Sequence, residues 1–170
     1  MGGAGLMDKI NGTDSAGCVI ESRLEMVRTS PVPIIQNSIG IYFINHIPDD
    51  SLNFSQPLLP LPERIFRRLF TPGKYGYTYL PSVKGGVIVT WYDGDGRKWG
   101  TGADDPADTI PPAPPSYAHN EFEVVYSTPV QPGTFNYRQE VHMTFSCWIY
   151  NDAGDSIFMD HGRFNTIFSY

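Results

Sequence analysis

The stretch EVHMTFSCWIYNDAGDSIFMDHGRFNTIFSY, residues 140–170, decides the fold of this chain. In its first part apolar and polar side chains alternate, which is the two-residue period of a strand with one buried face. One face carries Val141, Met143, Phe145, Cys147 and Ile149, and the other carries His142, Thr144, Ser146, Trp148 and Tyr150. Residues 151–155, NDAGD, tolerate positive φ and bond their own backbone, so we expect the chain to reverse there.

Working outward from this hairpin, further short strands are separated by frequent turns. The clearest is a second hairpin, with GVIVTWY at 86–92, a turn at 93–96 and a return strand at 97–101. Other strands are expected at residues 17–27, 39–44, 73–79 and 122–126. An apolar stripe that includes Leu69 and Phe70 predicts one short helix near residues 62–70, begun by Pro62.

Strands at this spacing predict an all-β chain folded as an antiparallel β-sandwich of about seven or eight strands. A length of 170 residues fits one domain, residues 1–170, in which residues 1–7 are expected to be a flexible N-terminal segment. The alternative is a lipocalin-like β-barrel that encloses an apolar ligand.

The charge balance limits the classes of partner. The chain has 12 basic and 18 acidic residues, a formal net charge of −6, and no basic patch that would neutralise phosphates, so nucleic acid is not expected as a partner. No apolar run reaches the ~20 residues that span a bilayer. Membrane attachment would therefore depend on a lipid anchor outside this chain.

Both cysteines, Cys18 and Cys147, fall on the apolar phase of their strands and should point inward. Two cysteines make neither a disulfide framework nor a metal-binding spacing. In an oxidising compartment they could pair, and the closed loop would contribute about 4 kcal/mol by the chain-entropy estimate. Two separate buried thiols are the simpler interpretation and the one we favour.

Acidic residues gather after the second hairpin and could hold a calcium ion, which takes six to eight oxygen ligands. These are Asp93, Asp95, Asp104, Asp105 and Asp108. The Asp-Gly-Asp-Gly spacing is not that of an EF-hand, and a tight turn requires the same residue types. We therefore favour a protein without a cofactor.

His119, Glu121 and Glu123 stand two residues apart, so they share one face of a strand and could bind a metal or transfer protons. An outward polar row opposite the apolar Phe122 and Val124 explains the same pattern more simply. No G-x-S-x-G motif accompanies Ser146 or any other serine, which argues against a serine hydrolase of that type.

Aromatic side chains provide the strongest functional signal. Rings that point away from the core are costly in water unless they meet a partner, and a flat ring stacks well on the C–H face of a sugar. The candidate glycan-binding residues are Tyr75, Tyr77, Tyr79, Trp91, Trp99 and Trp148. The competing interpretation is that other elements of the fold cover these rings.

Several stretches resemble the uncharacterised small secreted lipoproteins of Bacteroidetes. They are DKINGT at the start, GGVIVTWYDGDGRKW and EFEVVY in the middle, and MTFSCWIYNDAGDSIFMDHGRFNTIF at the end, where the match is strongest. The resemblance implies an exported all-β domain in the periplasm or at the outer-membrane surface, and it carries no catalytic residue across. The sequence does not match it throughout, since Met143–Ser146 lacks a glycine that the pattern has.

Together these observations predict a non-enzymatic, envelope-associated binding or structural accessory protein. Its partner would be a glycan at the aromatic face or another envelope protein at an uncovered sheet edge. The alternative function is a metal-assisted hydrolase that uses His119, Glu121 and the loop Asp93–Asp108.

Overall fold

The two strands of the closing hairpin are the longest of the described strands: β8 is Arg138–Tyr150 and β9 is Ser156–Ser169. They form an antiparallel ladder that runs from Arg138 opposite Ser169 to Tyr150 opposite Ser156. The structure, a computed structural model, describes residues 4–10, 18–29, 36–47, 67–79, 86–102, 119–130 and 138–169.

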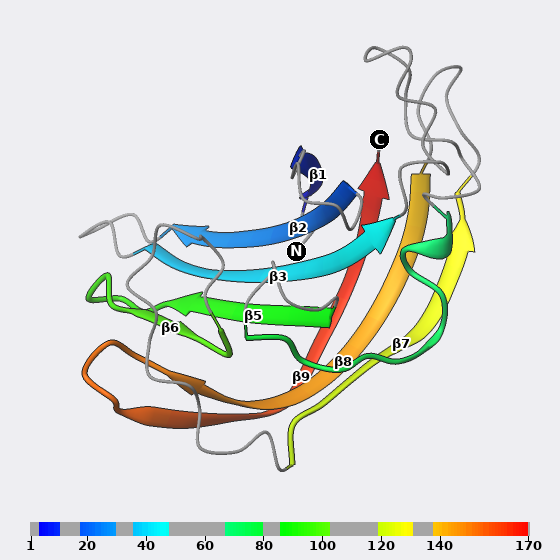
Figure 1. The fold of residues 1–170 in the computed structure, drawn as a ribbon. Helices are drawn as coiled ribbons and strands as arrows, with labels where there is room; N and C mark the ends of the chain where they lie inside the picture. The colour runs from blue at the N-terminus through cyan, green and yellow to red at the C-terminus, as the bar shows by residue number, and fades with distance from the viewer. Residues whose placement is uncertain are drawn as a thin grey trace.

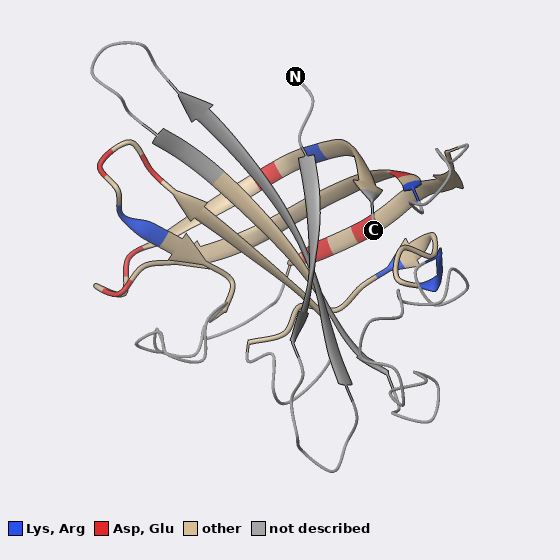
Figure 2. Ribbon diagram, turned by 90° about the horizontal axis from the view of Figure 1, so that it is seen from above, with Lys and Arg blue, Asp and Glu red and all other residues tan. Residues whose placement is uncertain are grey.

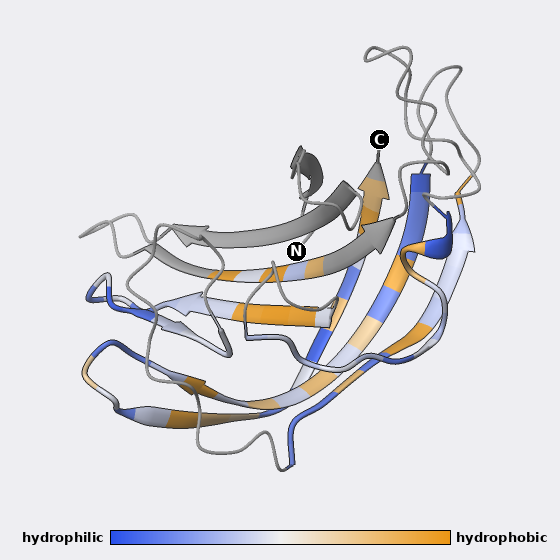
Figure 3. Cartoon of the chain, viewed as in Figure 1, coloured by the Kyte–Doolittle hydropathy of each residue, from blue (hydrophilic) through white to orange (hydrophobic). Residues whose placement is uncertain are grey.

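Alternation along β8 matches the prediction from the sequence. The odd-numbered side chains from Val141 to Ile149 are at most 4% exposed, whereas the even-numbered ones from His142 to Tyr150 are half-buried. Figure 3 shows the two kinds of residue as alternating bands along the strand. β8 therefore turns one face to the core and leaves the other outside.

The remaining described strands extend this hairpin into one sheet, in the order β4-β7-β8-β6-β5-β3-β2-β1-β9. Their bounds are β1 Ala4–Ile10, β2 Cys18–Thr29, β3 Gln36–Ile47, β4 Gly73–Lys74, β5 Gly86–Tyr92, β6 Lys98–Gly100 and β7 Glu121–Pro129. The long ladders β2–β3, β3–β5, β7–β8 and β8–β9 are all antiparallel. The all-β prediction is confirmed.

The sheet folds over itself in a sandwich-like way, so that β2, β3 and β5 cross the strands β7, β8 and β9 (Figure 1). Two short pairings join these layers, Gly100 with Tyr150 at one corner and Ala4–Gly5 with Ile167–Phe168 at the other. The long ladders do not continue around into a closed barrel. The barrel alternative is therefore not the fold of this chain.

Phe43 lies at the centre of the core between the layers and is completely buried. Its ring makes edge-to-face contacts with four other rings, those of Phe70, Tyr75, Phe122 and Phe168, at centroid distances of 5.4–6.2 Å. Such contacts stabilise an aromatic pair beyond the burial of its area. Because Phe43 comes from β3 and Phe122 and Phe168 come from β7 and β9, this cluster joins the two layers.

The structure differs from two local predictions and describes only part of a third. Residues 1–7, expected to be flexible, include the start of β1. Most of the predicted helix 62–70 lies outside the described residues, and its described end, 67–70, is a single helical turn in which the Thr71 hydroxyl donates to the Arg68 carbonyl. The expected strand 73–79 is paired as a strand only at Gly73–Lys74, and beyond it Tyr77 makes an isolated bridge to Val87.

Gly162 in β9 is a tight point of the inner layer, opposite Phe145. A Cβ atom there would lie 2.4 Å from Cζ of Phe145, a ring that is itself stacked between Phe122 and Phe164. We predict that Gly162→Ala lowers the free energy of unfolding by about 1–3 kcal/mol, the usual cost of overpacking a core. Denaturant unfolding measures this. Gly76→Ala is the control because a Cβ there has nothing within 4 Å, and equal stability of the two variants would contradict the prediction.

Candidate functional site

The outer face of β7, β8 and β9 carries polar side chains in rows that cross the strands. In one row Lys74, Glu123, Thr144 and Arg163 follow one another through the registers of β4, β7, β8 and β9. In the next row Glu121 lies opposite Ser146, and a register shift places Asp160 and His161 beyond it. Antiparallel pairing thus collects polar and charged groups from four strands on one surface.

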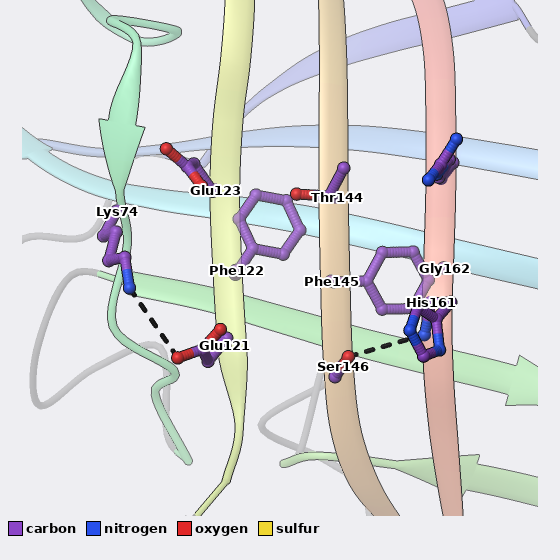
Figure 4. Close-up of a pocket in the computed structure, with 10 residues that line it drawn as sticks. Lys74, Glu121, Phe122, Glu123, Thr144, Phe145, Ser146, His161 and Gly162 are labelled. Atoms are coloured by element: carbon purple, nitrogen blue, oxygen red, sulfur yellow. Dashed lines mark hydrogen bonds and ion pairs between the residues drawn. The ribbon is translucent and has the colours of Figure 1, made fainter.

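A shallow cavity of about 150 Å³ lies over these rows. Figure 4 shows it, with side chains from β4, β7, β8 and β9 around it. It is lined by Lys74, Glu121, Phe122, Glu123, Thr144, Phe145, Ser146, His161, Gly162 and Arg163. Its volume is below the range of pockets that enclose a small ligand, so it can hold only part of a ligand that lies across the surface.

Ser146, Asp160 and His161 form a hydrogen-bonded group at the edge of this cavity. The Ser146 hydroxyl donates to Oδ1 of Asp160 at 2.9 Å, and Nδ1 of His161 lies 2.8 Å from Oδ2 of the same carboxylate. The carboxylate therefore sits between the serine and the histidine. A serine nucleophile needs the imidazole in that middle position to take its proton, so this geometry fits binding of a ligand rather than acyl transfer.

Ion pairing on this face is incomplete. Nζ of Lys74 lies 3.7 Å from Oε1 of Glu121, and both side chains are more than 70% exposed, so this pair contributes little to stability. Among the described residues, no ion pair or side-chain hydrogen bond engages Glu123 or Arg163, which flank Thr144. A carboxylate and a guanidinium are thus available to a ligand on either side of the cavity.

A pair of outward rings continues the same face toward the hairpin turn. Trp148 lies opposite Phe158, with ring centroids 5.1 Å apart, and Phe158 is 37% exposed. The backbone N–H of Trp148 donates to Oδ1 of Asn120 at 2.9 Å. Asn120, the residue before β7, thereby pairs a backbone N–H of β8 that lies beyond the β7–β8 ladder, and it holds Trp148 in place.

The structure does not gather the six predicted aromatic residues on one surface. Trp99 is 5% exposed within the core, and Tyr75, Tyr77 and Trp91 pack against that core. The hydroxyl of Tyr75 donates to the Thr71 carbonyl, and that of Tyr77 to the Glu121 carbonyl. Tyr79 is half-buried and its hydroxyl is enclosed.

Of the six, only Trp148 lies on the outer face of β8 beside the cavity. Tyr75, Tyr77, Trp91 and Trp99 are in the core or packed against it.

Asp93, the first of the predicted calcium ligands, organises a turn instead. Its Oδ1 accepts from the backbone N–H groups of Asp95 and Arg97, and its Oδ2 accepts from Nε of Arg97 and Nε1 of Trp99. Asp95 pairs with Nη2 of Arg97 at 3.0 Å. Acidic residues mark this turn and the turn between β8 and β9 (Figure 2).

The described residues contain no group of three or more metal-ligating side chains. Asp104, Asp105 and Asp108 lie outside the described residues, so the calcium site stays a prediction from the sequence.

The alternative hydrolase would use His119, Glu121 and the loop that begins at Asp93. His119 is exposed with φ of 72°, just before β7, and Glu121 is exposed and paired with Lys74. Asp93 lies on the other hairpin, with both oxygens occupied by N–H donors. The described members of this set therefore do not converge on a common pocket.

Cys147 is a free, buried thiol, so the structure contains no Cys18–Cys147 disulfide. Burial raises the pKa of the Cys147 thiol to about 12, so it is protonated and unreactive near neutral pH. Burial also raises the pKa of Tyr77, which lies beside it. The two groups form a neutral polar contact beneath the outer face of β8.

Comparison of the chain with the models of known protein families, with curated proteins and with solved structures found no match. Family membership is therefore not shown, and the resemblance to the Bacteroidetes lipoproteins stays a prediction. Within the described residues, none of the helical segments has the length and apolar character of a membrane span.

Sequence reasoning assigned no role to Phe158, Asp160 or Arg163 on this face. Counting back across the turn 151–155 pairs Tyr150 with Ser156 and so places Phe158 opposite Trp148, a signal that was available. Asp160 could not be found this way. The register shift after Phe145, where His161 takes φ of 55°, changes the count beyond it.

The Asp93 carboxylate makes stability depend on pH. Burial acts to raise its pKa, but hydrogen bonds from Trp99 and Arg97 outweigh this and lower the pKa below its ordinary value. The stabilisation is therefore present above the unfolded-state pKa near 4 and is lost as the pH falls through the lower folded-state pKa. We predict that Asp93→Asn lowers the melting temperature at pH 7 and that this difference shrinks on acidification.

Thermal unfolding between pH 7 and pH 2 measures the dependence on Asp93. Asp152→Asn is the matched control, since Asp152 is exposed in the other hairpin turn. A difference for Asp93→Asn that stayed constant across this range would contradict the role assigned to its charge.

Proposed function

We propose that this protein is a non-enzymatic glycan-binding module whose site is the outer face of β7, β8 and β9. The observation that carries the proposal is the outward ring pair Trp148–Phe158, which stands beside the cavity at Ser146 on the same face of β8. An aromatic platform next to converging polar groups is the combination that sugars require.

Each part of the face matches one part of a sugar. A pyranose ring has an apolar C–H surface, which stacks on an aromatic side chain and removes both surfaces from water. Its hydroxyls lie around the rim and need hydrogen-bond partners. Glu123 and Arg163 have no partner among the described residues, so they can accept from and donate to hydroxyls without breaking an internal pair.

Hydrolysis places stricter requirements on the carboxylates of this face than binding does. A hydrolase needs titratable groups with perturbed pKa values that converge in a pocket. The carboxylates of Glu121 and Asp160 on this face are exposed, that of Glu123 is half-buried, and Asp160 stands between Ser146 and His161. These properties support recognition of hydroxyl groups.

Location in the cell envelope forms part of the proposal and is supported by the sequence resemblance alone. Fractionation of cells that express the natural gene, followed by immunoblotting, measures it. Recovery in the cytosolic fraction would remove the envelope from the proposal and leave the glycan site to be judged separately.

We predict that Trp148→Ala abolishes retention by immobilised or gel-embedded polysaccharide. Loss of one stacked ring raises the dissociation constant about tenfold or more. Affinity electrophoresis against a panel of soluble polysaccharides, namely arabinoxylan, mixed-linkage β-glucan, galactomannan, glycogen, alginate and polygalacturonate, measures this retardation. Far-ultraviolet circular dichroism confirms that the variant is folded.

Tyr92→Ala is the matched control for loss of an aromatic side chain, because Tyr92 is a half-buried residue of β5 in the other layer. It should leave retention unchanged. If no polysaccharide in the panel retards the wild-type chain, or if Trp148→Ala is retarded as strongly as the wild type, the glycan proposal fails. Co-purification of an envelope protein would then favour the accessory role.

A further inference from the structure

A second outward ring pair lies on the same face, at the other end of β8. The rings of Tyr126 and His142 are paired across β7 and β8, with centroids 4.9 Å apart. Tyr126 is 45% exposed. A bulge at Val125 shifts the register of β7 by one residue and thereby turns Tyr126 to the outer face. Oε1 of Glu140 accepts a hydrogen bond from Nε2 of His142 at 2.8 Å and so orients the imidazole ring.

The cavity lies between the two ring pairs. Along β8 the order is His142, Thr144, Ser146 and Trp148, where the first and last belong to ring pairs and the middle two line the cavity. Six residues of strand at about 3.3 Å each separate the two platforms by ~20 Å. This exceeds the reach of one sugar ring or of a disaccharide.

We infer that the ligand is a neutral oligosaccharide chain of several units, which lies along β8 and contacts both ring pairs, with its middle units over the cavity. This inference rests on the proposed glycan-binding function and adds the length and class of the glycan. Tyr126 and His142 form a second stacking subsite, and Glu123 and Arg163 bind hydroxyls between the two platforms.

Charge favours a neutral chain. Lys74 and Arg163 are balanced by Glu121 and Glu123 around the cavity, and Asp160 adds a further negative charge at its edge. The whole chain carries a formal net charge of −6. A polyanionic glycan would be repelled at long range by this net charge.

Curvature favours a flexible, soluble chain. β8 bends along its length, and its concave side faces β3 and β5 (Figure 1). The outer face of β8 is therefore convex along the strand. A ligand that contacts both ring pairs must bend between them, which rotation about glycosidic bonds allows and the flat surface of a crystalline polysaccharide does not.

The test uses the neutral polysaccharide that retards the wild-type chain most strongly in affinity electrophoresis, together with its purified disaccharide and hexasaccharide. Isothermal titration calorimetry measures both oligosaccharides. We expect Tyr126→Ala to raise the dissociation constant for the hexasaccharide about tenfold and to leave the disaccharide constant unchanged. Tyr126→Phe keeps the ring and should bind the hexasaccharide like the wild type. Tyr92→Ala, in the other layer, should also bind the hexasaccharide normally.

The outcomes separate this inference from the function on which it rests. If Trp148→Ala loses binding while Tyr126→Ala binds the hexasaccharide like the wild type, the second subsite is wrong and the glycan function stands. Equal affinity for the disaccharide and the hexasaccharide would likewise overturn the extended site. Retardation by alginate or polygalacturonate alone would overturn the neutral class, and no retardation by any polymer would overturn both proposals.

Discussion

The structure depends on the contacts that the buried Phe43 ring makes with four other rings. Phe43 comes from β3, whereas Phe122 and Phe168 come from β7 and β9, so their edge-to-face contacts hold the two layers together. Phe70, at the end of the helical turn, stacks on Phe168 with ring centroids 4.1 Å apart and so also belongs to the cluster. Stacked sheets pack about 10 Å apart, and large rings fill that distance without a metal or a disulfide.

Packing of the inner face determines where the outer side chains lie. Successive residues of a strand point to opposite sides, so burial of Val141 to Ile149 turns His142 to Tyr150 outward. Antiparallel register then places partners from β7 and β9 beside them. Bulges at Val125 and after Phe145 change this order locally, and they turn Tyr126 outward and bring Asp160 to Ser146. Functional side chains commonly sit beside such irregularities.

The reach of sequence reasoning follows from the same geometry. Alternation between Val141 and Ile149, together with the turn residues 151–155, predicted the closing hairpin, its buried face and the outward position of Trp148. Alternation assigns a side chain to a face, but it does not show which face another layer will cover, and so the tyrosines at 75 and 77 and Trp99 were grouped with Trp148. Asp93 illustrates a second limit, because a turn and a calcium loop use the same residue types.

Residues of the core hold the outer face of β7 and β8 rigid from below. The hydroxyl of Tyr77 is shared between the carbonyl oxygens of Glu121 and Ser146, at 3.2 and 3.4 Å, and so supports β7 and β8 directly below the cavity. Phe145 stacks between Phe122 and Phe164 and lies against Gly162, which leaves the strands little freedom to move apart. Association costs less free energy when the binding groups are already held in place. The aromatic core thus keeps the rows of polar side chains in register, and this order would lower the free-energy cost of binding the extended chain proposed above.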